Sequence, residues 1–140
     1  MAQIGTGEQR PLSPHLQVWR WHVTMLGSIL HRATGFANYV GVALIVLWLF
    51  AAAMGPGRYA QYEQIAAHPV TQIILFGFTF SIVYHLLNGV RHLFLDAGAG
   101  YKPAFASMTA WIVLGLSLVG AAAIWLLAGL VPGVAIGGGA

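Results

Sequence analysis

The chain has 140 residues, of which 59% are hydrophobic and 6% are charged, with a mean hydropathy of +0.78. Soluble domains carry about 25% charged residues, so the composition excludes an ordinary soluble domain and predicts an integral membrane protein. The net charge of +3 is spread over separate loops and predicts no nucleic-acid binding, and the absence of cysteine excludes disulfides and thiolate-ligated clusters.

Three segments without Lys, Arg, Asp or Glu, at residues 33–57, 64–90 and 103–140, each match one membrane crossing, which takes about 20 apolar residues. We expect helices near 29–53, 69–95 and 107–130. They would form an all-α, up-and-down three-helix bundle over residues 29–140. The stretches "MGPGRYAQYEQ" and "AGAGYKP" read as connectors because they contain Gly, Pro and charge.

Residues 1–28 are expected to form a cytoplasmic, interfacial arm in front of the first helix. Two prolines in "RPLSPHLQVWRWHVTM" disfavour a long helix at its start, and Trp19 and Trp21 suit the headgroup layer. This arm could also contact a soluble partner.

The basic residues predict the orientation of the bundle. Arg58 alone lies in the first connector, whereas the other five lie before or at the start of the first helix and around the second connector: Arg10, Arg20, Arg32, Arg91 and Lys102. The positive-inside rule then places the N-terminus in the cytoplasm and the C-terminus in the periplasm. Because no secretory or transit-peptide pattern is visible, a bacterial inner (plasma) membrane is favoured over the mitochondrial inner membrane.

The second helix ends in "YHLLNGVRHLFLDAG", where polar and small residues recur at spacings that place them on one face: His85, Asn88, Gly89, His92 and Asp96. His85 lies about 16 Å along the axis from Asp96, deep in the membrane. A buried imidazole can ligate a metal or haem, relay protons or bond another helix, and the spacing leaves these three roles open.

A second axial ligand for iron is not expected within this chain. His85 and His92 are about 10 Å apart along the helix axis, too far to share one iron. No other histidine is expected at the depth of His85, so the partner of a bis-imidazole haem would come from another subunit. Gly89 could let a flat macrocycle approach the backbone or could serve close helix packing.

The first helix opens with "SILHRATG", in which Ser28, His31 and Arg32 have the spacing of one helix face. In an up-and-down bundle this cluster and the end of the second helix lie on the same side, so the two should converge. Together they could bind a carbonyl oxygen or an anionic propionate. Snorkelling is the alternative for Arg32 and helix capping for Ser28.

The third helix contains no charge. Its small residues Ser117 and Ala121 are expected to pack against other helices. Trp111 and Trp125 are expected near the two membrane interfaces.

The strings "RPLSPHLQVWRW", "SILHRATG" and "HLLNGVRHLFLDAG" resemble the cytochrome b556 anchor family of succinate dehydrogenase, respiratory complex II, over about residues 10–100. The resemblance implies a membrane anchor that binds one haem b together with a second small anchor subunit and forms part of a ubiquinone site. It also implies an iron–sulfur subunit and a flavoprotein subunit with FAD. Succinate oxidation would belong to the flavoprotein.

The resemblance also implies roles for individual residues of this chain. His85 matches the axial haem ligand, and Ser28 and Arg32 match quinone-binding residues. His31, Arg32 and His92 match the haem surroundings and propionate contacts, and Asp96 is interpreted as a proton supply for the reduced quinone. The remaining alternatives are an anchor of a quinol:fumarate reductase and a purely structural membrane subunit.

Overall fold

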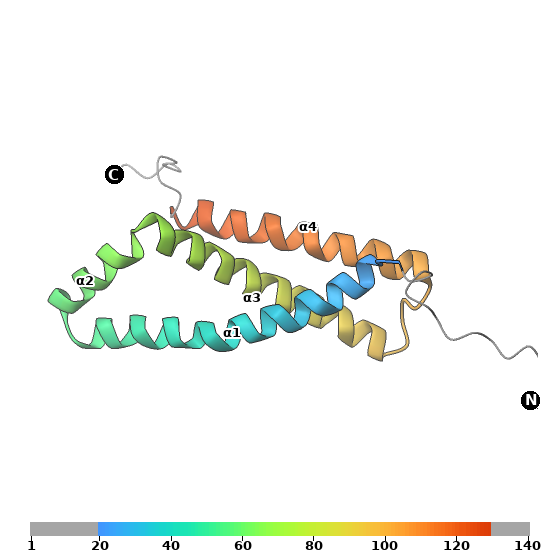
Figure 1. Cartoon of the computed structure of the whole chain (residues 1–140), viewed down its shortest axis with the longest axis horizontal. Coiled ribbons are helices and arrows are strands. Elements are labelled where there is room, and N and C mark those ends of the chain that lie inside the picture. Colours follow the sequence, from blue (N-terminus) through green and yellow to red (C-terminus); the bar gives the residue numbers. More distant parts are fainter. Residues whose placement is uncertain (1–19, 130–140) are drawn as a thin grey trace, which may run out of the picture.

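The computed structural model describes residues 20–129. They form four helices, α1 (Val23–Ala53), α2 (Pro56–Ala66), α3 (Pro69–Asp96) and α4 (Pro103–Leu127), and no strand within that range (Figure 1). Three of these helices, α1, α3 and α4, are long and apolar enough to cross a membrane. The predicted all-α fold with three spans is therefore confirmed.

The helix starts differ from the predicted ones more than the helix ends do. α3 agrees with its predicted range to within one residue, but α1 begins at Val23 rather than near residue 29, and α4 begins at Pro103 rather than near residue 107. Each of α2, α3 and α4 opens on a proline, which suits a first helical turn because its missing N–H would be unpaired there anyway. The predicted end of the third helix, residue 130, lies outside the described residues.

The early start of α1 changes the setting of the "SILHRATG" segment. His22 is extended, with φ −117° and ψ 142°, and the helix runs without interruption from Val23. Residues 23–28, which the sequence assigns to the interfacial arm, are thus helical, and residues 1–19 lie outside the described part of the chain. Ser28, His31 and Arg32 lie in the second and third turns of α1 rather than at its first residues.

The first connector contains a helix that the sequence does not predict. The segment "PGRYAQYEQIA" forms α2, directly after Gly55, whose φ of 93° suits glycine. The Gly and Pro that indicated a connector in fact form the start of this helix. α1 and α3 diverge towards this end of the bundle, and α2 links them (Figure 1).

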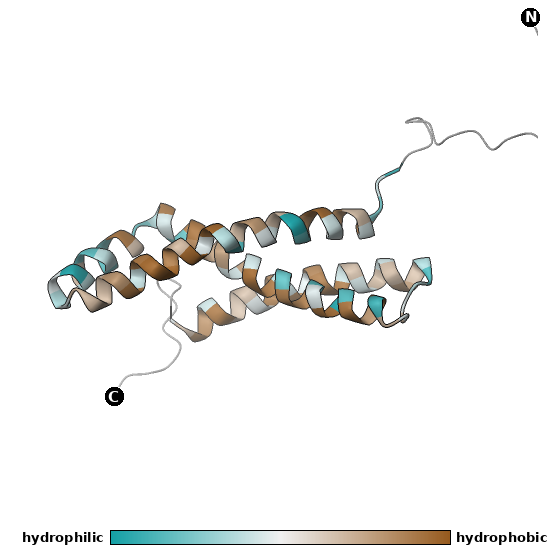
Figure 2. Ribbon diagram, turned by 90° about the horizontal axis from the view of Figure 1, so that it is seen from below, coloured by the Kyte–Doolittle hydropathy of each residue, from teal (hydrophilic) through white to brown (hydrophobic). Residues whose placement is uncertain are grey.

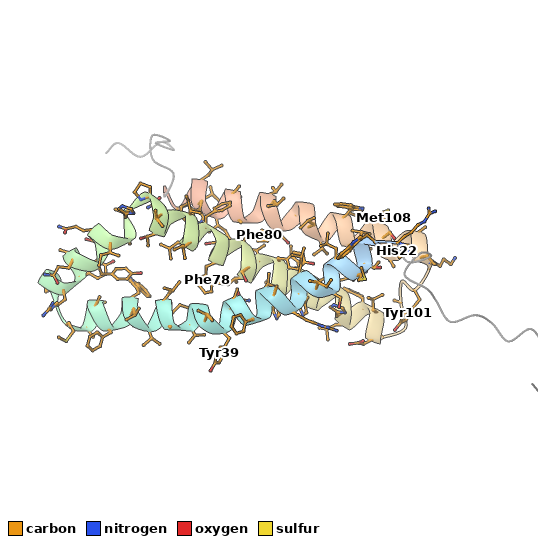
Figure 3. The ribbon with its side chains drawn as sticks, viewed as in Figure 1. His22, Tyr39, Phe78, Phe80, Tyr101 and Met108 are labelled. Carbon is orange, nitrogen blue, oxygen red and sulfur yellow. The ribbon has the colours of Figure 1, made fainter. Side chains whose placement is uncertain are left out.

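Small residues allow α1 to lie close to α3. The buried residues of α1 are Gly27, Thr34 and Gly41, seven residues apart along one face. At Gly41 the ring of Phe78 occupies the space that a Cβ would need. In Figure 3, Phe78 points into the space between the two helices, whereas Tyr39 points away from α3. The contact therefore depends on the absence of a side chain at Gly41.

α4 covers the other side of α3. Ser117 and Ala121 are fully buried at this contact, which confirms that they pack. Trp125, near the end of α4, is buried inside the bundle: its indole N–H donates to the Thr79 hydroxyl at 3.0 Å, and its ring packs edge-on against Phe76. An indole buried in this way satisfies its one polar group inside the bundle.

Arg91 ties α3 to the start of α4. Its guanidinium donates to the Thr109 hydroxyl at 3.1 Å and to the Ala106 carbonyl at 3.0 Å. This contact gives Arg91 a packing role in addition to its expected role in orientation.

Candidate functional site

A row of polar contacts runs along the α1–α3 interface, here called the polar seam. The Tyr84 hydroxyl donates to the Gly27 carbonyl at 3.0 Å, and the Ser81 hydroxyl lies 3.0 Å from the Thr34 carbonyl and 2.7 Å from Asn38 Oδ1. Such side chains satisfy one another inside a membrane bundle, where water is not available. In Figure 2 the hydrophilic turns of α1 and α3 stand out among apolar neighbours.

Three histidines gather within the seam and form the histidine cluster: His31, His85 and His92. The rings of His31 and His85 are stacked, with centroids 4.0 Å apart and planes at 5°. The His92 ring lies 5.1 Å from that of His31, tilted by 52°. The predicted convergence of the start of the first helix and the end of α3 is confirmed at these residues.

His85 is held by α1 through its Nδ1 atom. Nδ1 lies 3.2 Å from the His31 carbonyl oxygen and 3.4 Å from the Thr34 hydroxyl. A Cβ at Gly35 would approach the imidazole Cε1 to 3.0 Å, so the ring lies against the α1 backbone where glycine leaves room. The other nitrogen, Nε2, has no hydrogen-bond partner among residues 20–129.

His31 lies beside His85, so the expectation that His85 is alone at its depth is wrong. The early start of α1 and its crossing of α3 bring the two rings together. They still cannot ligate one iron from opposite sides in this arrangement. Two such nitrogens would be about 4 Å apart, at about 2 Å per metal–nitrogen bond, and each ring centre would lie beyond its nitrogen. The centroids themselves are 4.0 Å apart and the rings are stacked face to face. No group of three or more potential metal ligands occurs within the described residues.

Two buried polar atoms in this region lack a hydrogen-bond partner within the described residues. They are Nδ1 of His31 and Nδ2 of Asn88, whose side chain is only 1% exposed. An unpaired buried polar group costs about 1–3 kcal/mol. The polar seam thus offers hydrogen-bonding capacity that the described part of the chain does not use.

Ser28, Arg32 and Asp96 do not join the histidine cluster. Ser28 is half-buried and the other two are exposed, and none makes a hydrogen bond or ion pair within residues 20–129. His31 faces α3, and the next residue is turned about 100° around the axis, given 3.6 residues per turn. The expected single face is therefore divided: His31 belongs to the seam, and Arg32 lies beside it.

Sequence reasoning missed the hydroxyl and amide residues of the seam: Thr34, Asn38, Ser81 and Tyr84. Their signal is present in the spacing, because Gly27, His31, Thr34 and Asn38 follow one another at four, three and four residues. That spacing marks one helix face. Gly89 has more space around it than Gly35. A Cβ added at Gly89 would lie 3.9 Å from His31 Cε1, whereas one at Gly35 would lie 3.0 Å from His85 Cε1.

A pocket of about 560 Å³ lies away from the histidine cluster, between α1, α2 and α3 at the end where they diverge. Its lining is mostly apolar, with Arg58 and Gln61 among the polar exceptions. A second pocket of about 390 Å³ lies between α3 and α4, beside Arg91. Neither is lined by Ser28, His31, Arg32 or His85.

Comparison with known proteins places these features in a family. The model of the succinate dehydrogenase/fumarate reductase transmembrane subunit matches residues 6–124. The succinate dehydrogenase cytochrome b556 subunit of Paracoccus denitrificans is 45% identical over 102 residues, which cover 73% of this chain and 78% of the relative. That of Rickettsia prowazekii (strain Madrid E) is 36% identical over 84% of this chain and 92% of the relative. The mitochondrial succinate dehydrogenase cytochrome b560 subunit of Sus scrofa is 36% identical over 81% of this chain and 68% of the relative.

Proposed function

Because the chain belongs to the succinate dehydrogenase/fumarate reductase transmembrane-subunit family, we propose that it anchors a succinate:ubiquinone oxidoreductase. In this role it binds haem b and forms part of the ubiquinone site. Electrons reach the quinone from the iron–sulfur subunit, and the flavoprotein subunit with its FAD oxidises succinate. The names of the relatives support haem, since each is a b-type cytochrome subunit of succinate dehydrogenase.

The observation that carries the haem proposal is the state of the two His85 nitrogens. Nδ1 faces two oxygen atoms of α1, and Nε2 has no partner within the described residues. In a metal-ligating histidine, the N–H of the other ring nitrogen usually donates a hydrogen bond to a carbonyl or another acceptor, which fixes the orientation of the ring. His85 therefore fits the axial position of a haem, which supplies one-electron redox chemistry when bound.

The second axial ligand is proposed to come from the second small anchor subunit. His31 is too close to His85 to take the opposite side of the iron. Its unpaired Nδ1 suits a polar contact beside the ligand, such as a propionate. His92 contributes to the same surroundings through its contact with His31.

Ser28 and Arg32 are proposed to bind the ubiquinone carbonyl. Arg32 is exposed on a face of α1 that residues 20–129 do not cover, which suits a site shared with the iron–sulfur subunit and the other anchor. A hydroxyl and a guanidinium can donate to a carbonyl oxygen and stabilise the negative charge that develops on it during reduction. Asp96, exposed at the end of α3, is proposed to supply protons to the reduced quinone.

Substitution of Arg32 by leucine tests the quinone site. We expect quinone reduction by the assembled complex to fall by about 10²-fold, the order seen when a donor to a developing oxyanion is removed. Ser28→Ala is expected to give a smaller decrease. Succinate oxidation by an artificial dye should stay unchanged in both variants, because that step precedes the quinone.

The matched control is Arg58→Leu, which removes a cation at the other end of the bundle, where Arg58 bonds only Gln61 among described residues. It should leave quinone reduction intact. Equal loss of dye and quinone activity in the Arg32 variant would instead indicate failed assembly, whereas quinone reduction at the wild-type rate would contradict a role in quinone binding.

The orientation is proposed to place the N-terminus and the α3–α4 connector in the cytoplasm and the C-terminus in the periplasm of a bacterial inner membrane. Because the chain has no cysteine, single cysteines can report the side. In intact spheroplasts we expect an impermeant maleimide to label Gly57→Cys and to spare Ala97→Cys until the membrane is opened. Both sites are exposed. The reverse pattern would invert the topology.

A further inference from the structure

Thr34 is the only residue among those described whose side chain contacts the candidate haem ligand by a hydrogen bond. It lies in the middle of the polar seam and is 7% exposed. Its Oγ1 is 2.7 Å from the Leu30 carbonyl oxygen, 3.1 Å from the His31 carbonyl oxygen and 3.4 Å from His85 Nδ1. The hydroxyl thus has three neighbours and one hydrogen to donate.

The partners decide the direction of each hydrogen bond. Carbonyl oxygens can only accept, so the Thr34 hydroxyl donates to Leu30, its nearest neighbour. An oxygen lone pair is then left facing His85 Nδ1. The His31 carbonyl, 3.2 Å from the same nitrogen, also can only accept. Nδ1 therefore faces two acceptors, which assigns the ring proton to Nδ1 and the free lone pair to Nε2.

The His85 ring has little freedom to leave these acceptors. His31 stacks on it at a centroid distance of 4.0 Å. The Cε1 atom of His85 lies close to Gly35: a Cβ added at Gly35 would be only 3.0 Å from this atom. The ring orientation, and with it the direction of Nε2, is thus set by α1.

We propose that Thr34 is a positioning residue that, together with the His31 carbonyl, fixes the Nδ1–H tautomer of His85 and lowers the reduction potential of the haem. This inference rests on the proposed ligation of haem by His85. An acceptor at the outer nitrogen raises the basicity of a ligating imidazole, and a more basic ligand favours ferric over ferrous iron. Removing one of the two acceptors should therefore raise the potential.

The test is Thr34→Val, which keeps the shape and removes the oxygen, measured in the assembled complex by redox titration of the haem band. We expect the ratio of reduced to oxidised haem at a fixed potential to rise about threefold, an upward shift of about 28 mV at about 59 mV per tenfold for one electron. Haem affinity should fall by about tenfold, as for other outer-shell partners. Thr34→Ser, which restores the oxygen, should match the wild type.

Ser117→Ala is the matched control. Ser117 is also buried and its hydroxyl donates to the carbonyl four residues earlier at 2.6 Å, but it makes no hydrogen bond to a histidine among the described residues. It should not move the potential. Thr34→Ala, which cannot overpack, replaces the valine variant if that one does not assemble, and the same upward shift is expected.

The outcomes separate this inference from the proposed function. An unchanged potential and haem content in Thr34→Val, with haem lost in His85→Ala, would overturn the role of Thr34 alone. Haem bound unchanged in His85→Ala would overturn the ligand assignment itself. Equal shifts in Thr34→Val and Ser117→Ala would show a general packing effect and would also overturn the inference.

Discussion

Replacement of His85 by alanine is expected to abolish the b-type haem band in reduced-minus-oxidised spectra of the complex. The variant removes the one imidazole of the described chain whose Nδ1 faces two oxygen acceptors while its Nε2 is unpaired. Without this imidazole the described chain would no longer supply the proposed axial ligand, so we expect haem to be retained poorly. Spectra of the purified complex, normalised to its protein content, give the haem content directly.

His85→Met separates loss of ligation from loss of fold. A thioether can still ligate iron, and replacement of one imidazole by methionine raises the haem potential. We therefore expect the His85→Met variant to keep haem and to shift its potential upward. His68→Asn is the histidine control, because His68 caps α3 by accepting from the Val70 N–H at 3.3 Å, a role that asparagine can share. A haem band that persists unchanged in His85→Ala would contradict the assignment.

The spans could be predicted from the sequence because the bilayer imposes a length and excludes charge. The start of α1 could not be predicted in the same way. Residues 23–27 are mostly apolar, but they follow a segment with two prolines and two tryptophans, and no residue type there marks where the helix begins. α2 was missed for a related reason. Its opening Gly and Pro signal a turn and a helix start equally well.

The histidine cluster could be predicted as a convergence but not as a contact. Topology brings the start of the first helix and the end of α3 to the same side of the bundle. Which residues meet there depends on the rotation of each helix about its axis, which Gly27, Thr34 and Gly41 determine by allowing close approach to α3. Hence His31 turns towards His85, whereas Arg32 does not.

Thr34 shows why single polar residues in apolar segments are hard to interpret. In a helix, a threonine can bond the carbonyl one turn back and need no other partner. Thr34 does this with Leu30 and also contacts His85, 51 residues away in sequence. Only the packed structure distinguishes the second contact from the first.

Gly41→Ala is expected to destabilise the complex and to loosen the haem site together. The Phe78 ring occupies the space of the added methyl group, so α1 and α3 must separate or the ring must leave its position. Overpacking of this kind costs about 1–3 kcal/mol, occasionally more. Thermal unfolding of the detergent-solubilised complex, followed by native gel, should show a lower midpoint.

Two further variants test whether the Gly41–Phe78 contact is the cause of the lower stability. Gly77→Ala on α3 adds the same methyl where nothing lies within 4 Å, and it should be neutral or slightly stabilising, because alanine favours a helix over glycine by about 1 kcal/mol. The double variant Gly41→Ala/Phe78→Leu makes room for the methyl and should recover most of the loss. Equal effects at Gly41 and Gly77, or no recovery in the double variant, would contradict the packing account.

The same variant links packing to the haem site. Thr34 lies seven residues, about two turns, before Gly41 on the buried face of α1. If α1 moves away from α3 at Gly41, the Thr34 oxygen and the His31 carbonyl move away from His85 Nδ1. We therefore expect Gly41→Ala to raise the haem potential in the same direction as Thr34→Val, and Phe78→Leu to reverse that shift in the double variant. Destabilisation without any change in potential would show that the position of His85 does not depend on the α1–α3 contact at Gly41.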